Sequence, residues 1–419
     1  QAQAVAYTPK RSTALSRMST PQSRQWPSDG RTLASPHTAR AERQAPAVLS
    51  ELADSADIRF GGHRSWDIQV FDPAFYDRVL SAGSLGLGES YMDGQWDADC
   101  LDETFNRLLS ADLESQLVGA AGRGLWFRLA AAILRARLLN LQSPTRAFQV
   151  GERHYDTGND LYAAMLDPTM SYSCGYWAEA EDLEQAQLAK LDLICRKLEL
   201  APGERLLDIG CGGGGRAAHA ARHYGAEVVG VTISREQADL ARQRCAGLPV
   251  EIRLQDYREL SGRFHKIASV GMFEHVGRKN DQAFFDAAAR LLADDGLFLL
   301  HTIGTGAARP VNNPWIDKYI FPNGELPNAE RLASAVRPRF VLEDWHAFGP
   351  DYDRTLMAWW QNVDAAWSEL AAAGYDERFR RMWKYYLHCC AGFFRSRRGQ
   401  LWQLVLSSPR RRQVYRAPR

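Results

Sequence analysis

Residues 206–215 combine a short apolar run with a cluster of glycines. The apolar run suits a parallel strand that is covered on both faces. Glycines such as Gly210 and Gly212 tolerate positive φ angles and allow a ligand to approach the backbone closely. The pattern therefore predicts a nucleotide-type cofactor site, although the same turn can serve as a plain strand-to-helix connection.

Two side chains that can bind or transfer protons follow later apolar runs. Glu274 comes after the run at 266–270, and His301 ends the run at 296–301. A carboxylate can accept or relay a proton, and an imidazole can donate to an anion. The alternatives are a helix cap or surface acid for Glu274 and a core histidine for His301.

Alternating strand and helix patterns must position these groups. The strands are expected at 206–209, 227–232, 250–254, 266–270 and 296–301, and helices at 234–245 and 283–293. This alternation predicts an α/β fold with right-handed crossovers, a parallel sheet and a ligand crevice at the carboxyl ends of the strands. Asp182 with Gln185 forms a capping box for a helix before the first strand. The region 302–419 is expected to hold a loop, an aromatic-rich helical segment that includes Trp345, and a last strand at 401–406.

Two common nucleotide signatures are missing. Thr232 ends the second strand, where the dinucleotide pattern has an acid that binds a ribose. The chain also has no glycine-rich loop that ends in Gly-Lys-Ser or Gly-Lys-Thr. These features disfavour a dehydrogenase and a triphosphate-binding protein.

Composition is ordinary for a globular protein, with 419 residues, 45% hydrophobic and 24% charged. No run of roughly 18 apolar residues and no signal peptide is seen, which predicts a cytoplasmic protein. The seven cysteines are scattered without metal-binding spacing, so we expect reduced thiols and no metal site.

Both ends of the chain are basic. Residues 1–50 carry seven Lys or Arg against two acids and are expected to be disordered, with a transit peptide as the alternative. The tail 408–419 could attract nucleic acid or anionic lipid, or could simply be solvated.

A small mixed domain is expected over 51–145, with strands at 58–60 and 67–71, a helix at 73–80 and a glycine turn at 83–88. Its last helix repeats leucines at helical spacing, and a group of arginines surrounds them: Arg123, Arg128, Arg135 and Arg137. Such a helix can lie on an anionic membrane, or can pack on its own domain with the arginines in water.

The sequence resembles the S-adenosylmethionine-dependent cyclopropane fatty acid synthases over roughly residues 55–407. The strings that carry this resemblance beyond the glycine-rich turn are 83–94, 154–160, 172–174, 271–277, 300–304, 318–324 and 351–353. The resemblance implies a Rossmann-like class I methyltransferase domain over 146–407 and a lipid-binding and dimerisation role for 51–145. Gly213 departs from the family, which often has a bulky aromatic residue there.

The implied reaction transfers a methylene from S-adenosylmethionine to a cis double bond of an acyl chain in a membrane phospholipid, forming a cyclopropane ring. The weakly nucleophilic alkene must be held in line with the methyl group with water excluded, and a proton must then be removed. The resemblance implies that bicarbonate is the base, held by residues matching Cys174, Glu274, His301, Ile303 and Tyr352. It implies cofactor contacts for Tyr172, Ser173, Gly210, Gly212, Thr232, Gln237, Asp256 and Tyr257.

Other interpretations remain open for single residues and for the whole chain. Cys174 could be an inert buried thiol, Tyr352 a loop tyrosine, and Gln237 a capping-box partner of Ser234. The chain could instead be a related lipid methyl or methylene transferase, a small-amine N-methyltransferase, or a non-catalytic membrane-binding protein. We expect peripheral association with the inner membrane face, a homodimer and no nucleic-acid partner.

Overall fold

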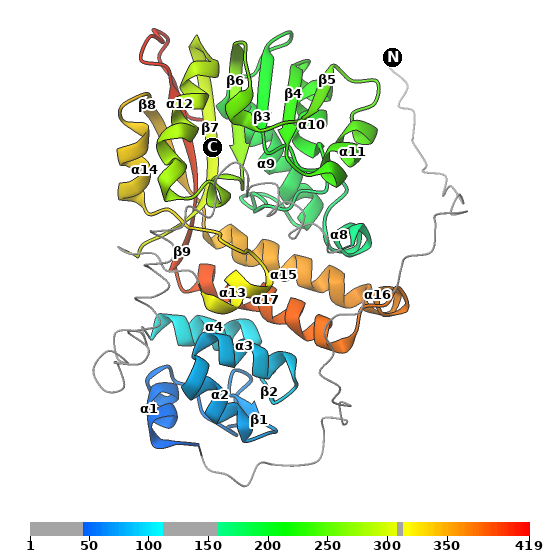
Figure 1. The fold of residues 1–419 in the computed structure, drawn as a ribbon, viewed down its shortest axis with the longest axis vertical. Helices are drawn as coiled ribbons and strands as arrows, with labels where there is room; N and C mark the ends of the chain where they lie inside the picture. Colours follow the sequence, from blue (N-terminus) through cyan, green and yellow to red (C-terminus); the bar gives the residue numbers. More distant parts are fainter. Residues whose placement is uncertain (1–44, 112–157, 308–312) are drawn as a thin grey trace. The chain divides into compact units, whose positions relative to one another are not determined.

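The computed structural model describes residues 45–111, 158–307 and 313–419. Its main feature is a seven-stranded sheet with the order β5-β4-β3-β6-β7-β9-β8 (Figure 1). The first five strands in this order are parallel, and β9 is antiparallel to both of its neighbours. The strands are β3 (Arg205–Ile209), β4 (Glu227–Thr232), β5 (Val250–Leu254), β6 (Phe264–Val270), β7 (Leu292–Thr305), β8 (Val341–Ala347) and β9 (Gly399–Ser407). The predicted α/β class and all the strands expected after residue 205 are confirmed.

Helices cover both faces of the sheet (Figure 1). On one face, α9 (Leu183–Lys197) and α10 (Gly215–Tyr224) share a buried cluster with Leu206, while on the other face α12 (Asp281–Leu291) and α14 (Ala329–Val336) share one with Leu207. Successive strand residues therefore enter opposite cores, which explains the unbroken apolar run in β3.

Two helices begin at the capping residues that the sequence predicts. Asp182 accepts a hydrogen bond from the Gln185 main-chain N–H at 2.8 Å at the start of α9. Ser234 accepts one from the Gln237 N–H at 3.3 Å at the start of α11 (Arg235–Arg244). Each cap satisfies a main-chain donor that has no partner within its helix.

The described part of the N-terminal region, 45–111, is mainly helical. It contains α1 (Ala47–Ser55), α2 (Ala74–Ala82), α3 (Ser84–Met92), α4 (Leu101–Ser110) and a two-stranded sheet of β1 (Gln69–Val70) and β2 (Trp96–Asp97). The expected strand at 58–60 is wrong, since only an isolated bridge joins Phe60 to Ile68. Helix α1 crosses the boundary expected at residue 50, and the basic helix expected near 125–138 lies outside the described residues.

The expected glycine turn at 83–88 is also wrong beyond its first residue. Gly83 separates α2 from α3 with φ +57°, but Gly86 and Gly88 are helical. A Cβ on Gly86 would lie 2.1 Å from the Arg78 carbonyl oxygen, and one on Gly88 would lie 2.3 Å from Trp315 Cδ1. These glycines therefore permit close packing of α3 against its neighbours.

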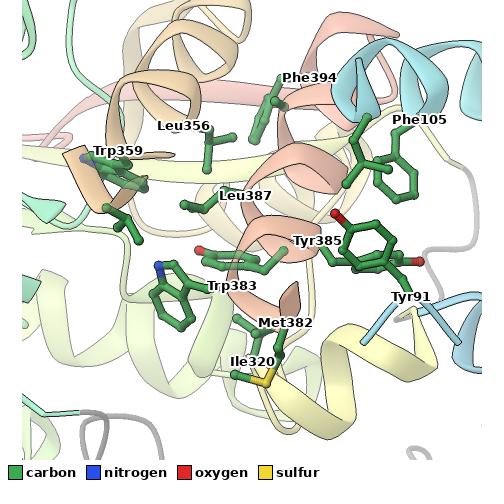
Figure 2. Close-up of a cluster of buried hydrophobic side chains, with 14 of the residues drawn as sticks. Tyr91, Phe105, Ile320, Leu356, Trp359, Met382, Trp383, Tyr385, Leu387 and Phe394 are labelled. Atoms are coloured by element: carbon green, nitrogen blue, oxygen red, sulfur yellow. The ribbon is translucent and has the colours of Figure 1, made fainter. Parts of the chain in front are cut away.

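The C-terminal region adds four helices around a large aromatic cluster. These are α13 (Pro314–Tyr319), α15 (Pro350–Ala365), α16 (Trp367–Ala372) and α17 (Glu377–Arg395). Figure 2 shows Tyr91 and Phe105 beside Tyr385 of α17, with ring centroids 5.6 Å and 4.9 Å from that of Tyr385. The small N-terminal region and the C-terminal helices thus share one core.

Trp345, expected in the helical segment, lies instead in strand β8 and packs edge-on against Trp402 of β9. The tail after β9 is held by ion pairs, since Arg410 binds Asp294 and Arg419 binds Asp344. Within the described ranges, no helix is long and apolar enough to cross a membrane.

Candidate active site

The turn after β3 has the backbone form that a close ligand requires. Gly210 and Gly212 have φ of +78° and +53°, which side-chain-bearing residues rarely adopt. A Cβ on Gly212 would have no atom within 4 Å, so the space beside it is open. A Cβ on Gly213 would lie 3.1 Å from Leu240, so a larger residue there would require Leu240 to move.

The next two parallel strands end beside this turn with the other expected cofactor residues. The Thr232 hydroxyl donates to Gln237 Oε1 at 2.8 Å, so Gln237 joins the end of β4 to helix α11. Asp256 follows β5 and binds Arg258 through both carboxylate oxygens. Tyr257 packs edge-on against Phe284.

Tyr172 and Ser173 lie on the segment that precedes α9. The Tyr172 hydroxyl is 2.7 Å from that of Tyr386 on α17. Lys190 of α9 donates to Ser173 Oγ at 2.8 Å, and Gln187 donates to the Ser173 carbonyl at 2.8 Å. Burial lowers the pKa of Lys190 to about 7. Both side chains of α9 therefore hold the segment 172–174 in place.

Glu274 lies in a short 3₁₀ turn, η2 (Phe273–His275), directly after β6. The Ile303 main-chain N–H donates to Glu274 Oε1 at 2.6 Å. Glu274 Oε2 is buried and has no hydrogen-bond partner among the described residues. Burial raises the pKa of Glu274 to about 7, in spite of the Ile303 hydrogen bond. The carboxyl group can therefore exchange a proton near neutral pH.

His301 and Ile303 lie inside β7 and not after its end, because the strand continues to Thr305. As residues i and i+2 of a strand, their side chains share one face of the sheet. The His301 ring is 1% exposed and packs edge-on against Phe348. Its Nδ1 lies 3.2 Å from Gln403 Nε2, while its Nε2 has no partner among the described residues.

Cys174 is held against the first turns of α15. The Gly175 N–H donates to Thr355 Oγ1 at 3.0 Å, and the Trp177 N–H donates to Asp351 at 2.7 Å. The Cys174 thiol is fully buried and donates to the Gly175 carbonyl at 3.1 Å. Burial, followed by the charge of Asp351, raises the pKa of this thiol well above its usual value. The side chain is a neutral thiol and not a thiolate nucleophile.

Tyr352 lies at the start of α15, one residue after Asp351. Its ring stacks on Phe394 of α17 with centroids 4.6 Å apart. Burial raises the pKa of Tyr352 well above its usual value, and the nearby Glu274 carboxylate raises it further. The hydroxyl is therefore a neutral donor in the neighbourhood of Glu274.

Several supporting residues escaped prediction from the sequence. Gln187 and Lys190 are polar residues on the buried face of α9, and this interruption of an apolar stripe was a usable signal. Thr355 and Gln403 had no such signal. Each is recognised only because strands or helices far apart in sequence meet in the fold.

The described residues fit the two groups that the resemblance implies. The open space at Gly212 and the positive-φ turn accommodate a cofactor close to the backbone. Glu274 Oε2 and His301 Nε2 are buried polar atoms without a partner in the described ranges, and a small polar ligand or a water molecule can supply the missing hydrogen bonds.

Known proteins resemble this chain over most of its length. The family model described as mycolic acid cyclopropane synthetase matches residues 142–404. The cyclopropane-fatty-acyl-phospholipid synthase of Escherichia coli (strain K12) is 54% identical over 360 residues, which cover 86% of this chain and 92% of that protein. Tuberculostearic acid methyltransferase UfaA1 of Mycobacterium tuberculosis (strain ATCC 25618 / H37Rv) is 32% identical over 395 residues, covering 89% and 86%.

A solved structure extends the similarity to the fold. The crystal structure of mycolic acid cyclopropane synthase CmaA1 complexed with SAH and CTAB is 33% identical, has a TM-score of 0.58, and covers 62% of this chain and 97% of that chain. Together with the parallel sheet and the glycine turn, this match defines a class I methyltransferase that uses S-adenosylmethionine. Given the 54% identity over most of both proteins, the chain belongs to the family of cyclopropane-fatty-acyl-phospholipid synthases, enzymes of S-adenosylmethionine-dependent methylene transfer.

Proposed function

We propose that the chain converts the cis double bond of an unsaturated acyl chain in a membrane phospholipid into a cyclopropane ring, with bound bicarbonate as general base. Family membership supports the methylene transfer, and the 54% identity to a cyclopropane-fatty-acyl-phospholipid synthase supports the substrate. Two buried atoms without partners in the described ranges, Glu274 Oε2 and His301 Nε2, support the proposal that bicarbonate is the base.

The residues proposed to hold the anion supply complementary groups. Tyr352 is a neutral hydroxyl donor, and His301 offers its second ring nitrogen. Cys174 and Ile303 are proposed to contribute through their main chains, although the Ile303 N–H also donates to Glu274. Glu274 is proposed to accept or relay the proton, since its pKa of about 7 makes both protonation states accessible.

The bound cofactor would supply the methyl carbon that becomes the ring methylene, and bound bicarbonate would supply the base that removes the proton. The chain's own task is to orient the alkene and exclude water. Buried aromatic rings lie next to the proposed anion-binding residues, since the Trp359 centroid is 5.2 Å from that of Tyr172 and 6.0 Å from that of Tyr352. Their faces are proposed to stabilise positive charge on the substrate during the reaction.

The test uses vesicles of unsaturated phospholipid and S-adenosylmethionine with a carbon-13 methyl group. The expected product has lost its alkene proton signals in the NMR spectrum and gained cyclopropane signals, with turnover that depends on added bicarbonate. Retained alkene signals or an exocyclic methylene would contradict ring formation. Mass alone cannot distinguish the two products, because ring formation and methylenation both add one CH2.

A related lipid methyl or methylene transferase is the second candidate, favoured by the 32% identity to a tuberculostearic acid methyltransferase. The same NMR experiment identifies it through the methyl-branched or methylenated product. A small-amine N-methyltransferase would turn over without vesicles and without bicarbonate. Binding of the cofactor without turnover on any lipid would instead identify a non-catalytic membrane protein.

We also propose peripheral association with the inner membrane face and a homodimer, as the family resemblance implies. The proposed membrane contact is the arginine-rich helix near 123–138, which lies outside the described residues. Sedimentation of the full chain with and without vesicles tests both proposals. A monomer at catalytic concentrations would contradict the homodimer, and a protein that stays in the supernatant would contradict the membrane association.

A further inference from the structure

Gln403 of β9 lies directly opposite His301 of β7 in the antiparallel pairing of these strands. Both side chains are fully buried, with exposed fractions of 0% and 1%. Gln403 Nε2 is 3.2 Å from His301 Nδ1, which is hydrogen-bonding distance. Burying a glutamine side chain in the middle of a sheet lowers the stability of the fold unless its amide is hydrogen-bonded.

The His301 ring carries a single proton. Burial lowers the pKa of His301 well below its usual value, and the positive charges of Lys190, Arg216 and Lys197 lower it further. In a neutral imidazole one nitrogen is a donor and the other an acceptor, and the partner of one nitrogen decides the role of the other. In the orientation that places Gln403 Nε2 against Nδ1, the amide nitrogen can only donate, so Nδ1 is the acceptor and the single ring proton belongs on Nε2.

Nε2 is the ring atom that has no partner in the described part of the chain. With its proton there, it becomes a hydrogen-bond donor, while Glu274 Oε2 provides an acceptor. One donor and one acceptor complement bicarbonate, which has anionic oxygens and a single O–H group. A His301 ring with the opposite tautomer would present a second acceptor beside Glu274, and bicarbonate has only one O–H group to donate to the two.

We propose that Gln403 is a positioning residue that fixes the His301 tautomer with its proton on Nε2, so that His301 donates to the bound anion and does not act as a base. The anion as the partner of Nε2 rests on the proposed function. The tautomer itself is a property of the free enzyme.

Three variants distinguish the effect of the His301 tautomer from the effect of side-chain packing. Gln403→Glu places a carboxylate at Nδ1, which accepts a hydrogen bond from a protonated Nδ1 and so reverses the tautomer. Gln403→Met keeps similar volume but removes the amide. Gln400→Met is the matched control, because Gln400 is on the same strand and its Oε1 accepts from the Trp402 indole at 3.1 Å.

The first measurement is the nitrogen-15 NMR spectrum of the full-length enzyme labelled at histidine, with the His301 signals identified by their loss in His301→Asn. We expect the wild type and Gln400→Met to show a protonated Nε2 and an unprotonated Nδ1. Gln403→Glu should show a protonated Nδ1, and Gln403→Met a mixture of tautomers. A wild-type ring with its proton on Nδ1 would overturn the proposal.

The second measurement is steady-state turnover on vesicles. Gln403→Glu and Gln403→Met should lower kcat by about 10- to 100-fold, the range seen when a partner that orients a metal-bound histidine is lost. The KM for S-adenosylmethionine should stay unchanged, which also shows that the variants are folded. Wild-type kcat in Gln403→Met, or lost activity with an unchanged spectrum, would also overturn the proposal. Wild-type turnover without bicarbonate would instead overturn the proposed base and leave the tautomer result standing.

Discussion

The Ile303 main-chain N–H donates to one carboxylate oxygen of Glu274 at 2.6 Å and leaves the other buried without a partner in the described ranges. One hydrogen bond fixes the orientation of the carboxyl group, while burial raises its pKa to about 7. The site thus retains a side chain that costs stability when ionised, which is typical of catalytic groups.

Glu274→Gln should abolish turnover and stabilise the free protein at pH 8. The folded-state pKa of about 7 lies above the usual glutamate value of 4.5, so ionisation of Glu274 opposes folding, increasingly from about pH 4.5 and fully above about pH 7. Removing the charge should raise the free energy of unfolding at pH 8 by about 1–3 kcal/mol. Urea unfolding at pH 8 and at pH 5 checks this, since the gain should shrink at the lower pH. Equal gains at both pH values would contradict the raised pKa.

The activity should fall at acidic pH as Glu274 becomes protonated. Because the ionised carboxylate is needed to accept a proton, kcat/KM for the lipid should fall as the pH falls through about 7. The pH–rate profile is measured with the bicarbonate concentration, and not the total carbonate, held constant. A profile that is flat down to about pH 5 would show that the ionised carboxylate is not required.

Arg395, the last residue of α17, should position Tyr352 indirectly, through the neighbouring residue Asp353. Its guanidinium forms two hydrogen bonds to Asp353, the neighbour of Tyr352, at 2.9 and 3.0 Å, and also pairs with Asp102 of α4 at 2.7 Å. Arg395→Lys cannot make the same bidentate contact, so kcat should fall about 10-fold with the KM for S-adenosylmethionine unchanged.

Arg378→Lys is the control for this prediction. Arg378 lies at the opposite end of α17 and binds Asp93 at 3.0 Å, so it also joins α17 to the N-terminal region but is far along the helix from Tyr352. This control should retain the wild-type kcat. Equal losses in the two variants would mean that docking of the N-terminal region matters, and not the position of Tyr352.

Vesicle binding should weaken as salt rises, because exposed arginines act through a screened potential. The screening length falls from about 10 Å at 0.1 M to about 3 Å at 1 M salt. Replacing Arg123, Arg128, Arg135 and Arg137 by Gln should reduce both binding and its salt dependence. Arg410→Gln is the control, because Arg410 is paired with Asp294. Binding that is independent of salt would contradict this electrostatic account.

The sequence determined the scaffold of the catalytic region. The apolar runs at 206–209 and 227–232 are local patterns that match buried parallel strands, and Asp182 and Ser234 cap helices through hydrogen bonds three residues away. Such features depend on neighbours along the chain, so they can be read without the fold. The turn predicted from Gly86 and Gly88 is wrong because these glycines serve close packing with residues in other helices. A side chain at either position would collide with Arg78 or Trp315.

Only the tertiary structure decided the chemical state of the candidate site. Burial raises the pKa values of Glu274 and Cys174, and the partner of His301 Nδ1 is Gln403, which is 102 residues from His301 in the chain. Desolvation and hydrogen bonding act through space, and their effects follow from which strands become neighbours in the sheet. The sequence supplied the groups, and the packing of β6, β7, β9 and α15 gave them their buried surroundings.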